Sequence, residues 1–233
     1  MIDVRSADSR FKTKISWLDS KHSFSFGQHY DPTNQGHGLL LVSNDDWVQA
    51  GTGFSTHPHQ DMEIVTWVLE GQLEHKDSEG HRGLLYPGLA QRMSAGTGIW
   101  HSEMNPSRDD DVRFIQMWVL PDTERIDPGY EQLDINSELE KGGLVPVASG
   151  RGHEAAIHIA QRDAVLWAGR LHPGEVVTVP DAKWVHLFVA RGGVVLEGAG
   201  ALGEGDAVRL TGAGSLELTA EGEGAEVLVW QMG

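Results

Sequence analysis

The chain lacks cysteine and has few prolines and few basic residues. Of its 233 residues none is cysteine, nine are proline and 18 are lysine or arginine. The absence of thiols excludes disulfides, cysteine nucleophiles, zinc fingers and iron–sulfur clusters. A chain without disulfides fits a reducing compartment, and its first residues do not resemble a signal peptide, so we expect a cytoplasmic protein.

Long apolar runs and a basic face are missing as well. No apolar stretch approaches the ~18–20 residues that a transmembrane helix needs, so we expect no membrane association. The 34 acidic residues leave a net charge of −16. Because nucleic acids and anionic membranes attract basic proteins, this charge argues against both as direct partners and permits a basic protein partner.

Glycine is abundant, and short strand-like segments follow one another along the chain. The 29 glycines exceed the usual ~7% and indicate many tight turns. The segments are rich in Val, Ile, Leu or Trp and cover residues 38–42, 62–69, 112–120, 176–179, 185–190, 194–197, 207–210 and 227–231. This pattern predicts an all-β fold of the barrel or jelly-roll kind, with one short helix expected at residues 136–141.

The two halves of the chain resemble each other weakly. The strand-like segment after His57-Pro58 has a counterpart after His172-Pro173. Between them, residues 121–143 are polar and rich in turn-forming residues. We therefore expect two stacked β-domains, residues 1–133 and 134–233, in a chain that is monomeric.

The first half of the chain contains two short motifs of possible metal ligands, His57-x-His59 and His101-x-Glu103. Residues i and i+2 of a strand point to the same side, so His57 and His59 share one face, and so do His101 and Glu103. Three neutral imidazoles and one carboxylate suit a divalent transition metal such as Fe(II), Mn, Co, Ni, Cu or Zn, with one or two positions left open. Either motif alone is more typical of a polar loop or strand edge, but together, framed by glycines, they predict a metal site.

The glycine framing resembles the metal-binding motifs of the cupin superfamily. The stretch Gly51-x5-His57-x-His59, closed by Gly71, is similar to the first cupin motif. The stretch Gly88-x5-Ser94-x-Gly96-x4-His101 is similar to the second, with serine where cupins usually have proline and two extra residues before the histidine.

One departure from the cupin pattern concerns the usual glutamate ligand. Ile64 occupies its place, and Glu63 lies one position away. A shift of one residue turns a strand side chain to the opposite face. We therefore expect Glu63 to face away from the metal, Ile64 to border the metal cavity, and Glu103 to supply the carboxylate.

A ligand set of His-x-His plus His-x-Glu is similar to that of the pirin family, and the resemblance covers essentially the whole chain. The matching stretches are 56–66 and 93–106, with 17–20, 24–26, 30–32, 44–46, 68–71 and 74–78. The layout is closest to the shorter bacterial pirin-like quercetin 2,3-dioxygenases. The resemblance implies a bicupin with one metal in the first domain. The second domain has His172-Pro173-Gly174 in place of His-Pro-His, so we expect no metal there.

For function, the resemblance implies metal-dependent cleavage of a flavonol such as quercetin by O2. His57, His59, His101 and Glu103 would hold one divalent metal, with Fe(II) as our first choice, and Glu103 is the natural general base for the flavonol hydroxyl. The alternative is a non-enzymatic, metal-dependent sensor or regulatory partner-binding protein, as other pirins are. A third possibility, an isomerase on the cupin frame, fits the ligand pattern less well.

Several other residues have ordinary structural explanations. We expect Phe24, Phe26 and Tyr30 to pack in the core rather than to line a pocket for an aromatic ligand. Asp45 and Asp46 are expected to form a turn rather than a metal site.

The remaining histidines are expected to be structural or exposed. His186 lies in an apolar run and should be packed or buried in an interface. His75 and His81 flank a predicted hairpin turn at residues 78–80 and are expected to be exposed. Trp100 precedes His101 and should point to the opposite side of its strand.

Overall fold

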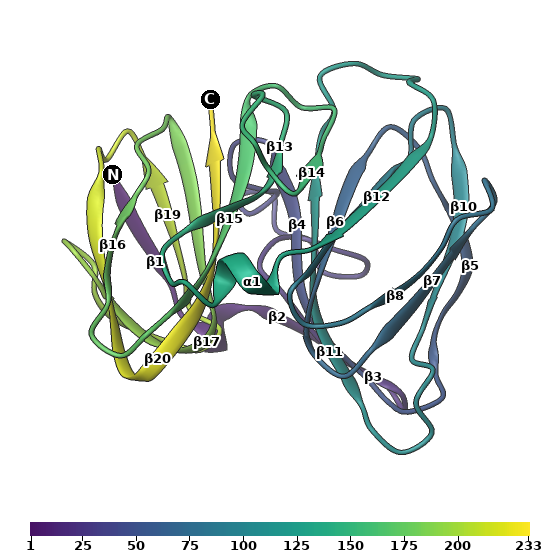
Figure 1. Cartoon of the computed structure of the whole chain (residues 1–233), viewed down its shortest axis with the longest axis horizontal. Coiled ribbons are helices and arrows are strands. Elements are labelled where there is room, and N and C mark those ends of the chain that lie inside the picture. The colour runs from purple at the N-terminus through teal and green to yellow at the C-terminus, as the bar shows by residue number, and fades with distance from the viewer.

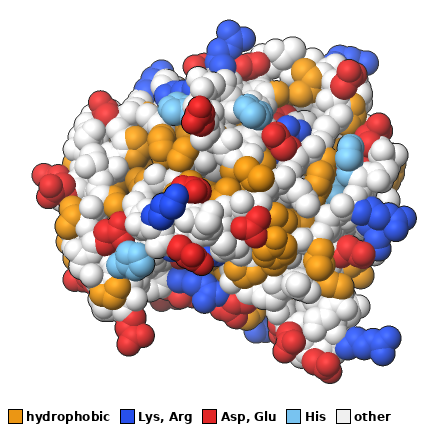
Figure 2. Space-filling model, viewed as in Figure 1, with side chains coloured by type: hydrophobic (Ala, Val, Ile, Leu, Met, Phe, Trp, Pro, Cys, Tyr) orange, Lys and Arg blue, Asp and Glu red, His pale blue; other side chains and the backbone are white.

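The computed structural model describes residues 1–233, which form two lobes of β-structure side by side (Figure 1). The all-β prediction is confirmed. Acidic and basic side chains are interspersed over the face seen in Figure 2.

The N-terminal lobe contains two antiparallel sheets. The larger has seven strands in the order β12 (Gly129–Asp134), β9 (Leu89–Ser94), β6 (Glu63–Glu70), β11 (Val112–Val119), β4 (Leu40–Val48), β3 (Leu18–His22) and β2 (Phe11–Lys14). The smaller has four in the order β5 (Gly53–His59), β10 (Ile99–Met104), β7 (Leu73–Asp77) and β8 (Arg82–Leu85). Val68 and Phe114 of the larger sheet pack with Leu73 and Leu85 of the smaller, so the lobe has an interior of its own.

The C-terminal lobe is a single sheet of nine strands. Its order is β1 (Ile2–Arg5), β19 (Ala207–Thr211), β17 (Trp184–Leu196), β20 (Leu216–Met232), β15 (Ala164–Leu171), β13 (Val145–Ser149) and β14 (Ile157–His158), with β16 (Val176–Val179) beside β20 and β18 (Gly200–Gly203) beside β17. All pairs are antiparallel except that of β13 with β14. The first strand of the chain thus lies in the second lobe, where Ile2 is paired with Leu210.

Helix is confined to two short segments. The α-helix α1 (Asn136–Leu139) lies within the predicted segment 136–141, just after the predicted domain boundary, and a 3₁₀ turn, η1, covers Ala7–Ser9. Neither is long enough to cross a membrane.

One prediction about the strands is wrong. The segments 185–190 and 194–197 were expected as separate strands but are both part of β17. Gly192 between them has a φ of 72°, and a Cβ there would lie 2.1 Å from the carbonyl oxygen of Gly224. The register against β20 shifts at this point, so the glycine marks a bulge that bends a continuous strand rather than a turn that ends it.

The largest apolar cluster lies between the two lobes. Side chains alternate along β11, so Ile115, Met117 and Val119 face the other lobe while the residues between them face the interior of their own lobe. From the C-terminal lobe, Leu166 and Trp230 enter the same cluster. Because each sheet is covered on this face only by the other lobe, we expect neither lobe to be stable alone.

Buried charges also join the lobes, and they overturn the prediction that Asp45 and Asp46 form a turn. Both residues are buried in the middle of β4. Asp45 accepts hydrogen bonds from Arg113 (2.9 Å) and Arg10 (3.1 Å), and Arg113 also pairs with Glu204 of the C-terminal lobe (2.6 Å). Burial opposes ionisation, but the two arginines outweigh it and lower the pKa of Asp45.

Substitution of Ile115 by alanine tests the shared core. Removing a buried Ile side chain typically costs about 2–5 kcal/mol. Because both lobes bury this cluster, we expect urea denaturation to show one transition for the whole chain, shifted as a unit in the variant. Leu133→Ala, which truncates an exposed side chain of the same lobe, should change stability by less than about 0.5 kcal/mol. Two separate transitions, of which one moves, would contradict a shared core.

Substitution of Asp45 by asparagine tests the buried ion cluster. The variant leaves Arg10 and Arg113 without their shared counter-charge, which we expect to cost about 3 kcal/mol at pH 7. Since the folded-state pKa is below that of the unfolded chain, this stabilisation is present above about pH 4 and is lost as the pH falls further. The difference in unfolding free energy between wild type and variant should therefore shrink toward pH 3. Asp19→Asn, in the exposed pair with Lys14, serves as control and should cost less than about 1 kcal/mol.

Candidate metal centre

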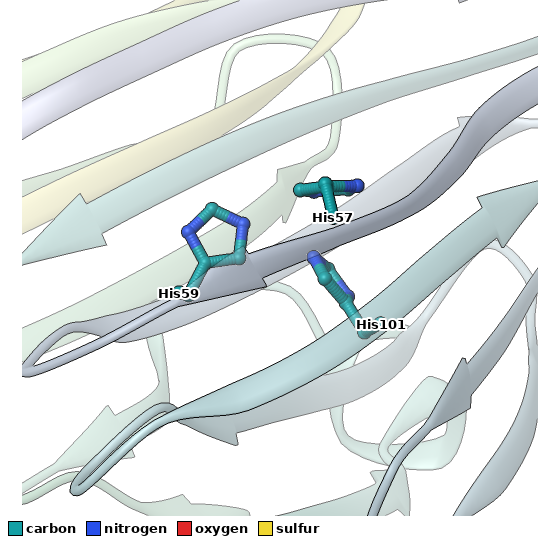
Figure 3. Close-up of side chains that lie close together, drawn as sticks. All are labelled: His57, His59 and His101. Atoms are coloured by element: carbon teal, nitrogen blue, oxygen red, sulfur yellow. The ribbon is translucent and has the colours of Figure 1, made fainter.

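Two neighbouring strands bring the three motif histidines together. His57 and His59 extend from β5 to the same side, and His101 is the cross-strand partner of His57 on β10. Their ring centroids are 4.4–4.9 Å apart, and one ligand atom from each lies within 4.8 Å of the others. Figure 3 shows the three rings next to one another above these two strands. Trp100 points to the opposite side and is half-exposed, as the alternation of β10 predicts.

Hydrogen bonds hold one ring nitrogen of His57 and one of His101, whereas His59 has none. Nδ1 of His57 lies 2.8 Å from the carbonyl oxygen of Ser55, which can only accept, so this nitrogen carries the proton and Nε2 keeps its lone pair. The Nε2 atoms of His59 and His101 are buried and have no hydrogen-bond partner in the protein. One ring nitrogen from each of the three histidines thus lies within 4.8 Å of the others and is free of other partners or can be so, which is what a divalent metal ion requires.

His59 and His101 remain neutral over the physiological pH range. Burial, followed by the neighbouring rings of His101 and His57, lowers the pKa of His59 to about 4. Burial and the rings of His57 and His75 lower the pKa of His101 to about 3. Protons therefore do not compete for these nitrogens near neutral pH.

Glu103 lies beside this cluster and is held by two donors. It is buried, shares the face of β10 with His101, and forms a second group of close ligand atoms with His101 and His75. Its Oε2 accepts a hydrogen bond from Nε2 of Gln116 at 2.7 Å, and its Oε1 accepts one from Thr66 at 3.4 Å. The carboxylate is thus oriented from β6 and β11, across the interior of the lobe.

The expected orientation of Glu63 is confirmed. Its carboxylate is buried on the opposite face of β6, where it accepts hydrogen bonds from Ser94 (2.9 Å) and from the backbone of Ala160 in the C-terminal lobe (3.1 Å). Ile64 points into the lobe but packs against Met93 and does not line the cavity described below.

The prediction that His75 is exposed is wrong, and the sequence analysis missed the role of its surroundings. His75 is buried on β7 behind His101, with the two Nδ1 atoms 3.5 Å apart. Its Nε2 donates to Asp77 at 3.2 Å, and Asp77 also accepts from Nδ1 of His81, whose side chain is partly exposed. Burial disfavours the charged form of Asp77, but these donors outweigh it and lower its pKa.

This arrangement fixes the protons along the chain of groups. Asp77 accepts from Nε2 of His75, so Nδ1 of His75 is the unprotonated nitrogen. It can then accept only from a protonated Nδ1 of His101, which leaves Nε2 of His101 as the free lone pair. The sequence spacing His75-x-Asp77 carried a signal for this, because i and i+2 share a strand face.

A cavity of about 640 Å3 is lined by His57, His59 and Glu103, whereas His101 lies behind its wall. Its aromatic walls are formed by Trp17, Phe26, Phe54 and Trp118. The ring of Trp118 stands edge-on to His59 at 4.9 Å, and Phe26 contacts Trp118 at 5.5 Å. The volume is within the range of ~300–1,000 Å3 usual for small-molecule sites.

The three aromatic residues that were expected to pack in the core, Phe24, Phe26 and Tyr30, have three different environments. Phe24 is buried in the core, as expected. Phe26 lines the cavity instead, so the expectation of core packing is wrong for this residue. Tyr30 is 76% exposed and belongs to neither.

The cavity also has a polar side opposite the histidines. His22, Asn44 and Ser20 line it, and Nδ1 of His22 lies 2.9 Å from Oδ1 of Asn44. Asp46 accepts a hydrogen bond from the hydroxyl of Ser20. Burial, helped by the charges of Asp45 and Glu103, raises the pKa of Asp46 to about 7. The cavity can therefore hold a planar aromatic molecule that carries hydroxyl groups at its edges.

Comparison with known proteins agrees with this geometry. The profile named Pirin matches residues 4–119, and that of the quercetinase C-terminal cupin domain matches residues 146–232. The protein Rv0181c of Mycobacterium tuberculosis is 55% identical over 232 residues, which cover 99% of this chain and 95% of the relative. The chain belongs to the pirin family. The predicted bicupin fold is confirmed by this membership and by the structural match described next.

Solved structures and a second relative extend the comparison. The crystal structure of YhhW from Escherichia coli has a TM-score of 0.93 and 36% identity, covering 100% of this pirin and 98% of that chain. Another structure is of YhhW in complex with nickel(II), with a TM-score of 0.91 and 35% identity, covering 100% and 99%. A quercetin 2,3-dioxygenase of E. coli is 40% identical over 198 residues, 85% of each chain.

Proposed function

We propose that this pirin is a metal-dependent dioxygenase that cleaves a flavonol such as quercetin with O2. The observation that carries the proposal is the cluster of His57, His59 and His101, two of which line an aromatic-walled cavity. The name of the E. coli relative at 40% identity supports the same chemistry. His57, His59, His101 and Glu103 are proposed to hold one divalent metal, with Fe(II) as the first candidate.

The fit between these residues and a metal rests on their donors. Neutral imidazoles and a carboxylate suit Fe(II), Ni and the other divalent transition metals. When bound, the metal would acidify a coordinated hydroxyl and provide the open position for the substrate. The remaining steps depend on the side chains around it.

Glu103 is proposed to act as the general base. The flavonol would lie against the aromatic wall formed by Trp118 and Phe26 with its hydroxyl toward Glu103, whose carboxylate can take the proton. Gln116 and Thr66 would keep the carboxylate oriented during that transfer. The walls of the cavity exclude water from the deprotonated ring, and the polar groups around His22 and Asn44 can bind its distal hydroxyls.

The variant Glu103→Gln tests the role of the base. An amide can accept from Gln116 through its oxygen and donate to the Thr66 hydroxyl through its nitrogen, but it cannot accept the proton, so we expect quercetin loss to slow about 10²–10⁴-fold. O2 uptake, quercetin loss and carbon monoxide release should be measured after loading with Fe(II), Mn, Co, Ni or Cu, and metal content determined in the same samples. Glu124→Gln, at an exposed site, is the control.

The possible outcomes distinguish a failure of the proposed metal site from a failure of the proposed dioxygenase activity. Unchanged quercetin turnover in metal-loaded Glu103→Gln would exclude Glu103 as the base. Stoichiometric metal binding by wild type without turnover of quercetin would leave the site and reject the dioxygenase, in favour of a metal-dependent sensor or partner-binding protein. A His57→Ala/His101→Ala double variant should bind no metal and show no turnover.

The chain of His75 and Asp77 behind His101 provides a second test. His75→Phe keeps an aromatic ring against Tyr130, which lies 4.9 Å from His75, but removes the acceptor for Nδ1 of His101. Loss of such a partner typically weakens metal binding about 10–100-fold. His75→Asn places an acceptor oxygen near the former Nδ1 and should restore most of the affinity. Competition with a chromophoric chelator measures it, with His153→Phe, at an exposed site, as control. Equal affinity in wild type and His75→Phe would show that His75 does not support the ligand.

A further inference from the structure

A second, much smaller cavity lies where the lobes meet, away from the metal centre. It measures about 20 Å3, and none of the eight residues that line it is acidic, although the chain carries 34 acidic residues. Arg5, Arg10 and Arg209 line it together with His186, Ser23 and Asn34. The prediction that His186 is packed is confirmed, since its side chain is buried and its ring lies 5.5 Å from that of Phe24.

The guanidinium of Arg209 lies at this cavity and is not paired with a carboxylate. Its guanidinium is buried, and its Nη2 donates only to neutral oxygens, those of the Ser23 carbonyl (2.9 Å) and the Asn34 side chain (2.7 Å). It makes no ion pair. Asp3, its cross-strand neighbour, pairs with Arg5 instead. A buried cation left in this way is costly unless something offsets its charge.

The other two arginines differ in this respect. Arg10 is already paired with Asp45, and the pair of Arg5 with Asp3 lies at the partly exposed rim. Neither carboxylate forms an ion pair with Arg209, although the charge of Asp3 partly opposes the lowering of the pKa of Arg209. The ring of Phe24, 4.5 Å below its guanidinium, provides a cation–π contact, which offsets only a small part of a buried charge.

Three polar atoms around the cavity have no partner in the protein. They are Nε of Arg209, Oγ of Ser23 and Nε2 of His186, and each belongs to a residue that is at least nine-tenths buried. Nε of Arg209 can only donate, and the serine hydroxyl and the imidazole nitrogen can donate as well. A ligand that accepts from all three and carries negative charge would satisfy every one of them.

We propose that this cavity binds one small inorganic anion of the size of chloride. The cavity volume limits the size of the ligand. A space of ~10–15 Å3 holds about one water-sized particle. The cavity of about 20 Å3 therefore has no room for an organic acid. The ligand is expected to be negatively charged, because the guanidinium of Arg209, which has no ion pair, is the dominant charged group at the cavity. Burial and the charge of Arg5 lower the pKa of Arg209 to about 10, so it is still cationic at neutral pH.

The anion would join the two lobes. Ser23 comes from the segment after β3 of the N-terminal lobe, whereas His186 and Arg209 come from β17 and β19 of the C-terminal lobe. Bound between them, it stabilises the folded chain by mass action and not the unfolded one. This inference does not depend on the proposed dioxygenase activity.

Thermal unfolding in different sodium salts at equal ionic strength tests the site. We expect the Tm of the wild type to be about 5 °C higher in saturating chloride or bromide than in gluconate, which is too large for the cavity. Arg209→Met should abolish this difference, and Ser23→Ala, a milder change that keeps the fold, should reduce it. Arg108→Met, at an exposed site, should leave it unchanged. A wild-type Tm that is the same in all three salts would overturn the proposal.

Crystals grown in sodium bromide locate the anion directly. We expect an anomalous peak within hydrogen-bond distance of Nε of Arg209 and Nε2 of His186. An ordered water only at this position, or a bromide found only on the exposed surface as an adventitious ion, would reject the site even if the salts differ in their effect on Tm.

Discussion

The central strands of the seven-stranded sheet, β6, β11 and β4, are buried on both faces, and the rest of the molecule depends on this. Along β6 and β11, one set of alternating side chains packs against the C-terminal lobe, while the other set faces the interior of its own lobe. Gln116 on β11 orients Glu103, and Ile115 and Met117, its neighbours in sequence, join the shared core. The C-terminal lobe, which we expect to lack a metal, therefore has a physical role, because it covers the back of the strands that orient the site.

Sequence spacing predicted the parts of this design that follow from one strand at a time. His57, His59, His101, Glu103 and the reversal of Glu63 all follow from the period of two and from short motifs. What spacing could not predict were relations between strands. His75 is buried because β7 pairs with β10 behind His101, which depends on the sheet order. The adjacent residues Asp45 and Asp46 are typical of a turn. In the structure, however, Asp45 is paired with arginines that are distant in sequence, and Asp46 is buried in the wall of the cavity.

The protein's own hydrogen bonds prepare the metal centre. A backbone oxygen holds Nδ1 of His57, and the His75–Asp77 pair holds Nδ1 of His101, so both rings present the opposite nitrogen. Burial lowers the pKa of His59 and of His101, so these two imidazoles stay uncharged at neutral pH. Such preorganisation means that the ligands do not have to be reoriented or deprotonated when an ion arrives, which favours tight binding.

The pairing of β1 with β19 has a consequence for how the chain is made. During synthesis on a ribosome, Ile2 leaves the exit tunnel long before its partner Leu210. Until then β1 has no sheet to join. The N-terminal lobe can begin to collapse in this interval, but the second sheet closes only when nearly the entire polypeptide is available. Contacts between residues so distant in sequence form slowly. A segment fused ahead of Ile2 would therefore interfere first with the folding of the C-terminal lobe, in which β1 pairs with β19.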